Sequence, residues 1–162
     1  MKQYFDKAFN KIAVLGSGTM GSQIASHFAN LGFEVVMFDM NKEALNASLK
    51  SLRKLKPTPL ASPSVINSIK TATYESLDII SQCDFIIESV VENLEIKKQL
   101  FANIAPHVNE KAVLVTNTSG LSIEKIAEHA PENLRSRIFG VHFFNPPRYL
   151  PLVELIRTSY SD

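Results

Sequence analysis

The sequence predicts an α/β fold: a doubly wound, mostly parallel sheet with helices on both faces. Short apolar runs with strand character alternate along the 162 residues with stretches whose apolar positions recur at helical spacing. The last two apolar runs, 138–144 and 151–156, are separated by only about six residues. Because a parallel crossover needs a dozen or more residues, these two strands should pair antiparallel if they are neighbours. We therefore expect one antiparallel strand near the C-terminus.

The first predicted unit is a strand over residues 12–15, a glycine-rich turn and a helix. The turn consists of Gly16, Ser17, Gly18, Thr19, Met20 and Gly21. The helix, which ends at Gly32, has one apolar stripe made of Met20, Ile24, Phe28 and Leu31. In a dinucleotide-binding turn, the first glycine permits the tight turn, the second admits a pyrophosphate, and the third lets helix and strand pack closely. The helix N-terminus attracts the phosphates, so the unit predicts a Rossmann-type fold.

Asp39 ends the second predicted strand, which covers residues 33–38. It lies 18 residues after Gly21, near the spacing at which an acidic residue binds the ribose hydroxyls of NAD. Its negative charge would repel the 2′-phosphate of NADP, which argues against phosphate binding by the nearby Lys42. Alternatively, Asp39 is a loop residue that caps the next helix. We predict NAD as the cofactor.

The remaining elements are predicted in chain order. A helix is expected over residues 41–56, with Asn41 as its N-cap and prolines from Pro57 onward ending it. Further elements are expected at residues 65–69 (helical), near 72 (strand), 76–82 (helix or turn), 84–88 (strand) and 112–115 (strand). Asn93 and Ser122 are candidate N-caps of two more helices. The apolar stripe of the first of these consists of Ile96, Leu100 and Ile104.

The composition argues against several classes of protein. With 17 basic and 16 acidic residues, the net charge is +1, and no basic patch indicates nucleic-acid binding. The single cysteine, Cys83, excludes an internal disulfide and fits a reducing compartment, so we expect a cytoplasmic protein. No apolar run approaches the roughly 18 residues of a membrane span. The first ten residues lack the apolar core of a signal peptide, and we predict no metal site.

Polar residues follow each predicted strand at the point where it ends. In a doubly wound sheet, ligands bind outside the carboxyl ends of the strands, so these residues should gather at one edge. Besides the glycine turn, they include Asp39, Glu92, Asn117, Ser119, His142 and Asn145. This convergence indicates a binding site more strongly than any single motif does.

His142 leaves a predicted strand at this edge, whereas His27, His107 and His129 lie on or near predicted helices. Glu154 lies among apolar residues of the last strand, and an acid buried there needs a partner. If the last two strands pair, Glu154 can hold one imidazole nitrogen of His142 and leave the other as a general base. Two alternatives stay open, namely a structural His142 bonded to a carbonyl and a Glu154 exposed on an edge strand.

Five segments together resemble the NAD-binding domain of L-3-hydroxyacyl-CoA dehydrogenases. They are residues 16–21, 91–94, 117–119, 142–146 and 152–154. The resemblance implies oxidation of an L-3-hydroxyacyl-CoA substrate by NAD to 3-ketoacyl-CoA in fatty-acid β-oxidation. It implies His142 as the catalytic base, Glu154 as its orienting partner and Ser119 as a ligand of the substrate oxygen beside the nicotinamide. It also implies that Asp39 holds the adenine ribose and that the nicotinamide side involves Glu92, Lys97, Asn117 and Asn145.

The segment Pro-Pro-Arg-Tyr at 146–149 resembles the long β-oxidation enzymes that join this dehydrogenase to an enoyl-CoA hydratase. In the family, a second, all-helical domain supplies a catalytic Asn, much of the acyl cleft and the dimer contacts. We therefore expect residues 1–162 to form one dinucleotide-binding domain of a longer protein, which is a homo-oligomer or part of a β-oxidation assembly. Alone, the domain should bind NAD but turn over weakly or not at all.

Two other functions fit parts of the pattern. A dehydrogenase of small hydroxy acids that does not use CoA shares the glycine turn but typically uses a lysine base, for which Lys97 is the candidate. A non-catalytic NAD-binding module would bind NADH without any effect of acyl-CoA. The residue on which hydride transfer depends, His142 or Lys97, distinguishes the first of these from the dehydrogenase that the resemblance implies.

Overall fold

The computed structural model describes residues 9–161 and contains one seven-stranded sheet of order β3-β2-β1-β4-β5-β6-β7. The strands are β1 (Lys11–Leu15), β2 (Glu34–Asp39), β3 (Ile69–Thr73), β4 (Phe85–Glu88), β5 (Val113–Thr116), β6 (Ile138–Phe143) and β7 (Val153–Ile156). The first six are parallel, and β7 pairs antiparallel with β6, so that His142 stands opposite Glu154. The predicted fold class and its antiparallel last strand are confirmed.

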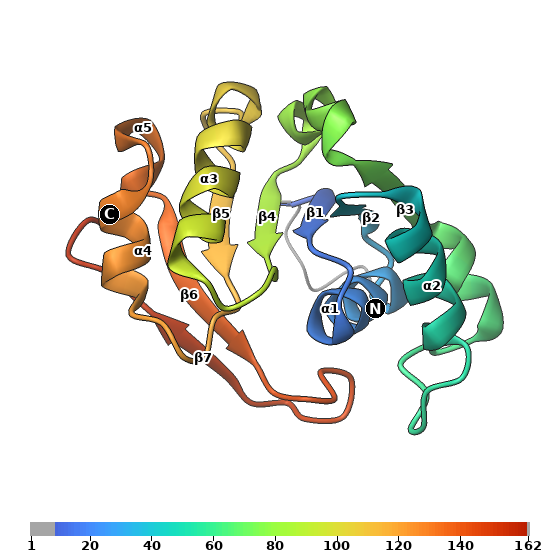
Figure 1. Ribbon diagram of the computed structural model, residues 1–162. Coiled ribbons are helices and arrows are strands. Elements are labelled where there is room, and N and C mark those ends of the chain that lie inside the picture. The colour runs from blue at the N-terminus through green and yellow to red at the C-terminus, as the bar shows by residue number, and fades with distance from the viewer. Residues whose placement is uncertain (1–8, 162) are drawn as a thin grey trace.

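Helices cover both faces of the sheet (Figure 1). They are α1 (Thr19–Asn30), α2 (Lys42–Leu52), α3 (Leu94–Ile104), α4 (Ile123–His129) and α5 (Glu132–Arg135), with 3₁₀ turns at Pro63–Ser68, Tyr74–Gln82 and Ala105–His107. Successive strand residues point to opposite faces. Val14 of β1 accordingly packs in one core with Ile24 of α1, and its neighbour Leu15 packs in the other with Phe101 of α3. Both cores are thus built from the same strands.

Three helices begin where the sequence predicts. The side chains of Asn41, Asn93 and Ser122 each accept a hydrogen bond from a backbone N–H in the first turn of α2, α3 and α4. Gly32 adopts a φ of +89° just after α1, as expected for the left-handed residue that ends a helix. The three N-cap residues and Gly32 thus determine where these helices begin or end.

Two elements differ from the prediction. The helix α2 ends at Leu52 instead of residue 56, because the expected last turn offers only the half-buried Leu55 to the core, while its other residues are exposed. In α3, Ile96 is 43% exposed, and the buried face includes Lys97 instead. A lysine reaches that face because a buried carboxylate from β4 neutralises its charge.

The structure bears on two further expectations from the composition. Within residues 9–161, no helix combines the length and the apolar character that crossing a bilayer requires. The expectation about the first ten residues falls mainly on residues 1–8, which lie outside the described residues. Cys83 is fully buried, and burial raises the pKa of its thiol to about 11, in keeping with a packing role.

Candidate active site

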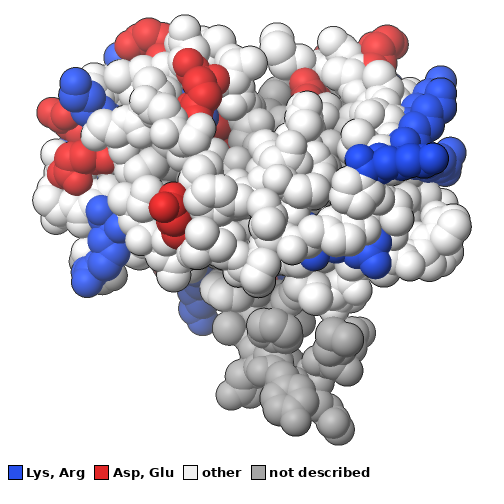
Figure 2. All heavy atoms as spheres, turned by 90° about the horizontal axis from the view of Figure 1, so that it is seen from below, with Lys and Arg blue, Asp and Glu red and all other residues white. Residues whose placement is uncertain are grey.

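Two adjoining cavities lie at the carboxyl ends of the parallel strands. The first, of about 420 Å³, is lined by Gly16, Gly18, Asp39 and Tyr74 among others. The second, of about 310 Å³, is lined by Met20, Glu92, Asn117, Ser119, His142 and Asn145 among others. Ser89 and Val90 border both, so the two form one continuous site. Figure 2 views this edge, where most charged side chains stand at the margins.

The glycine turn shapes the junction between the cavities. Gly16 has a φ of +103°, a conformation that only glycine adopts without strain. A Cβ on Gly21 would lie 2.0 Å from the carbonyl oxygen of Gly16, so a side chain there would force helix and turn apart. A Cβ on Gly18 would meet no atom within 4 Å, which leaves this backbone open to a ligand. The predicted structural roles of Gly16 and Gly21 are therefore confirmed.

Asp39 lies at the end of β2 and faces the glycine turn. Its Oδ2 accepts hydrogen bonds from the backbone N–H of Ser17 at 2.7 Å and from the hydroxyl of Ser17 at 2.5 Å. Its Oδ1 accepts from the N–H of Met40 at 2.7 Å. Asn41, and not Asp39, caps α2, so the alternative role as a helix cap is wrong. The carboxylate lies at the wall of the first cavity.

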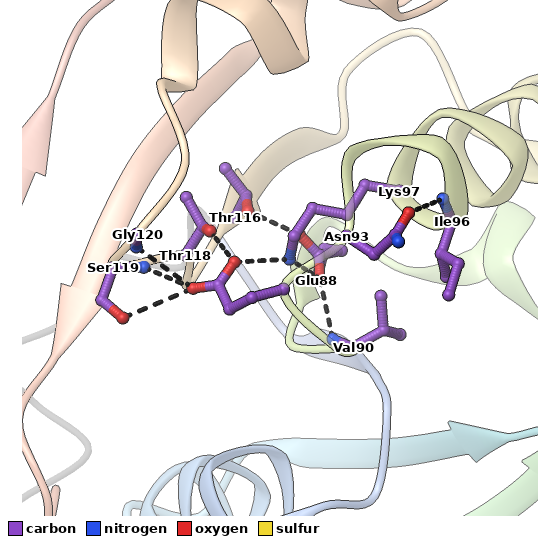
Figure 3. A network of polar contacts seen from close by, with 10 residues as sticks. Glu88, Val90, Asn93, Ile96, Lys97, Thr116, Thr118, Ser119 and Gly120 are labelled. Atoms are coloured by element: carbon purple, nitrogen blue, oxygen red, sulfur yellow. Dashed lines mark hydrogen bonds and ion pairs between the residues drawn. The ribbon is translucent and has the colours of Figure 1, made fainter.

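A buried ion pair joins β4 to α3 behind the second cavity (Figure 3). The Nζ of Lys97 lies 2.7 Å from Oε1 of Glu88, and the two side chains are 1% and 0% exposed. Glu88 also accepts hydrogen bonds from the N–H of Val90 and from the hydroxyl of Thr116. Sequence reasoning missed Glu88, although an acid at the end of an apolar strand was a signal. Lys97 itself does not line either cavity, because its ammonium is engaged with Glu88.

Glu92 connects this pair to the loop after β5. Its carboxylate accepts hydrogen bonds from the hydroxyl of Thr118 and from the backbone N–H groups of Ser119, at 2.7 Å, and Gly120, at 3.3 Å. Its Oε2 also lies 3.7 Å from Nζ of Lys97. Burial alone would raise the pKa of Glu92, but these hydrogen bonds and the ammonium together hold it below its ordinary value. Glu92 is therefore an anion that positions Ser119.

His142 and Glu154 meet across the antiparallel strands β6 and β7. The Nδ1 of His142 lies 2.9 Å from Oε2 of Glu154, and their side chains are 23% and 52% exposed. Because a carboxylate oxygen only accepts, Nδ1 carries the hydrogen, and Nε2 is the nitrogen left for a reaction partner. The alternative of a structural His142 bonded to a carbonyl is wrong. Glu154 does lie exposed on an edge strand, yet it is paired with His142.

Two asparagines hold the loop around His142. Asn117 accepts the backbone N–H of Phe143 at its Oδ1, 2.9 Å away, and thereby links the ends of β5 and β6. Asn145 accepts a hydrogen bond from Nε2 of Gln23 on α1 at 3.0 Å. His27 lies outside both cavities; its pKa is lowered by burial and by the charge of Arg148. The predicted site residues therefore lie together at this edge of the sheet, except Lys97, which lies behind it.

The profile of the family described as 3-hydroxyacyl-CoA dehydrogenase, NAD binding domain, matches residues 11–162. The chain belongs to this family. The family resemblance and the NAD prediction are therefore confirmed. Within residues 9–161, no group of three or more His, Cys, Asp or Glu side chains is placed to hold a metal ion.

Similar proteins are longer than this chain. A Rickettsia felis protein, provisionally named a fatty acid oxidation complex trifunctional enzyme, is 42% identical over 157 aligned positions, covering 92% of this chain and 22% of that protein. A Bacillus subtilis protein, provisionally named a 3-hydroxyacyl-CoA dehydrogenase, is 37% identical over 178 aligned residues, covering 96% of this chain and 23% of that protein. The chain thus spans about a fifth of the length of these relatives.

Solved structures share the fold. The 3-hydroxybutyryl-CoA dehydrogenase of Escherichia coli is 30% identical with a TM-score of 0.82, over 95% of this chain and 34% of that one. The (S)-3-hydroxybutyryl-CoA dehydrogenase PaaH1 of Ralstonia eutropha is 32% identical with a TM-score of 0.78, over 94% of this chain and 56% of that one. These relatives are NAD-dependent oxidoreductases by family, which agrees with the enzyme class that the sequence predicts.

Proposed function

We propose that this chain is the cofactor-binding domain of an enzyme that oxidises L-3-hydroxyacyl-CoA to 3-ketoacyl-CoA in fatty-acid β-oxidation. One observation carries the proposal: the His142–Glu154 pair lies beside a cavity whose walls continue into the glycine turn. A proton acceptor next to a dinucleotide cradle is the arrangement that alcohol oxidation requires.

The residues fit NAD. The open backbone at Gly18 and the N-terminus of α1 suit the pyrophosphate, and Asp39 suits the adenine ribose. The second cavity would then receive the nicotinamide half, beside Glu92, Asn117, Ser119 and Asn145. Lys97 lies behind the cavity wall and would act indirectly, because its ammonium stabilises the negative charge of Glu92. When bound, NAD supplies the acceptor for the hydride.

His142 would act as the general base. Its Nε2 takes the proton of the C3 hydroxyl while the C3–H electron pair leaves as hydride, so the C–O bond becomes a carbonyl. Glu154 balances the charge that His142 gains and keeps the ring oriented through Nδ1. The hydroxyl of Ser119 faces Oε1 of Glu92 at 3.4 Å, and it would turn to donate a hydrogen bond to the same substrate oxygen. In the reverse direction, the imidazolium returns the proton to the developing alkoxide.

The acyl-CoA substrate and the larger assembly also belong to this proposal. The similar proteins carry further sequence, and one is named as part of a fatty acid oxidation complex. The helical substrate domain expected for the family would complete the acyl cleft. We therefore propose that residues 1–162 bind NAD by themselves and catalyse weakly or not at all.

The alternative with Lys97 as the base is disfavoured. The ammonium of Lys97 is bonded to a fully buried carboxylate and lines neither cavity, so a substrate hydroxyl in the site does not meet it. A base must come within hydrogen-bond reach of the proton it removes.

The experiment is hydride transfer from NADH to acetoacetyl-CoA in the protein that carries this domain, measured by the loss of NADH absorbance. We expect His142→Ala to slow the reaction by about 10²–10⁴-fold, the contribution of a positioned general base. Calorimetric titration with NADH should show that this variant still binds the cofactor. A variant that keeps the full rate, or loss of transfer only in Lys97→Ala, would contradict the assignment.

A further inference from the structure

Gln23 connects the cofactor helix to the loop that follows His142. Its side chain is buried on α1, two residues after Gly21, the last residue of the glycine turn. The Nε2 atom donates two hydrogen bonds, one to the backbone carbonyl of Thr19 at 3.2 Å and one to Oδ1 of Asn145 at 3.0 Å. The second bond joins residues 122 positions apart in the sequence.

The Thr19 carbonyl fixes the orientation of the side-chain amides of Gln23 and Asn145. A carbonyl oxygen only accepts, so the end of the Gln23 amide beside it must be the NH₂ group. This NH₂ group also faces Asn145, which must therefore turn its own oxygen toward Gln23. The NH₂ group of Asn145 is left to other partners, and Asn145 is an exposed residue that lines the second cavity with His142.

We propose that Gln23 is a positioning residue that makes Asn145 a hydrogen-bond donor toward an oxygen on the nicotinamide half of the bound cofactor. An unrestrained asparagine presents either its oxygen or its NH₂ group by a half-turn of the amide, whereas Asn145 presents only the NH₂ group. The nicotinamide carboxamide and its ribose both carry acceptor oxygens. The inference rests on the proposed function, because it requires the second cavity to receive this half of the cofactor.

The test compares the affinities of the 162-residue chain for NADH and for ADP, measured by calorimetric titration. ADP carries the adenosine and both phosphates but lacks the nicotinamide half. In Gln23→Leu, Asn145 loses its restraint, and we expect NADH affinity to fall about three- to tenfold, the range of one neutral hydrogen bond. Gln23→Glu offers only acceptors, which draw the NH₂ group of Asn145 away from the cofactor, so the loss should be larger. ADP affinity should stay unchanged in both variants.

Ser26→Ala is the matched control. Ser26 is fully buried on the same helix, bonds the carbonyl of Ser22 at 2.9 Å and lines neither cavity. We expect this variant to bind NADH and ADP like the unchanged chain. It shows whether removing any buried polar group from α1 weakens binding.

A double-mutant cycle tests whether Gln23 acts through Asn145. We expect the double variant Gln23→Leu/Asn145→Ala to bind NADH no more weakly than Asn145→Ala alone. Additive losses, an unchanged NADH affinity in Gln23→Leu, or equal losses for NADH and ADP would each overturn the inference. An unchanged chain that binds neither ligand would instead contradict the proposed function.

Discussion

Two acid–base pairs lie at this edge of the sheet, one beside the second cavity and one behind it, and they differ chiefly in their access to water. The Lys97–Glu88 pair is 1% and 0% exposed with its charged atoms 2.7 Å apart, whereas the His142–Glu154 pair is 23% and 52% exposed at 2.9 Å. The first spans β4 and α3, and the second spans β6 and β7. The contact distances are similar, so distance alone does not separate a structural pair from a reactive one.

The difference in burial assigns the roles. If Lys97 and Glu88 separated, each charge would be buried without water or a partner. Breaking this pair therefore costs much free energy. That pair can hold the loop ends in place, but it is poorly suited to exchange protons with a substrate. The partly exposed imidazole of His142 can meet a substrate and return its proton to solvent. The following predictions test this division of roles.

The largest expected effect is on stability, from Lys97→Met. This change leaves the carboxylate of Glu88 buried without its cation, and breaking such a pair typically costs about 3–5 kcal/mol. Urea denaturation followed by circular dichroism would measure the loss. The double variant Glu88→Gln/Lys97→Met removes both charges and should recover a large part of it. If Lys97→Met were as stable as the unchanged chain, the structural role assigned to the buried pair would be contradicted.

Glu154→Gln should give the opposite pattern. Because this pair is half-exposed, we expect the free energy of unfolding to change by less than about 1 kcal/mol. Hydride transfer in the protein that carries this domain should nevertheless slow, since the imidazolium of His142 loses its compensating charge. The two measurements are denaturation and the rate of NADH oxidation by acetoacetyl-CoA. A large loss of stability with an unchanged rate would reverse the roles assigned above.

The smallest effect concerns pH, through Glu92 beside the buried pair. Burial raises the pKa of Glu92, but the hydrogen bonds from Thr118, Ser119 and Gly120 and the charge of Lys97 together hold this pKa below its ordinary value in the folded protein. A lowered folded pKa contributes stability that is present above the unfolded value and is lost as pH falls through the folded value. Stability should therefore decrease less on acidification below about pH 4.3 in Glu92→Gln than in the unchanged chain. The denaturation midpoints of both proteins are measured at pH 5 and at pH 3. An equal change in midpoint between the two pH values would contradict the prediction.

Some features at the carboxyl edge of the sheet can be predicted from the sequence more completely than others, for physical reasons. The glycine turn depends on backbone conformation within six residues, so Gly16, Gly21 and the following helix could be read locally. The meeting of His142 and Glu154 was also predictable, because a short connection forces the two last strands antiparallel.

Other contacts depend on side chains that no local pattern brings together. The periodicity of α3 placed Ile96 on the buried face, but the cation of Lys97 is buried because Glu88 arrives from another strand. The bond between Gln23 and Asn145 likewise depends on how α1 and the loop after β6 pack. The sequence therefore predicts that His142 and Glu154 meet, whereas the residues that support them emerge only from the fold.

The most direct measurement of the central claim is a nuclear Overhauser effect in this chain with NADH bound. If the nicotinamide half enters the second cavity, the protons on C4 of the ring lie near the Cε1 proton of His142. We expect a cross-peak between them, lost in His142→Ala, while the adenine ribose protons show contacts around Asp39. Contacts of the nicotinamide protons confined to the first cavity, with none to His142, would contradict the account.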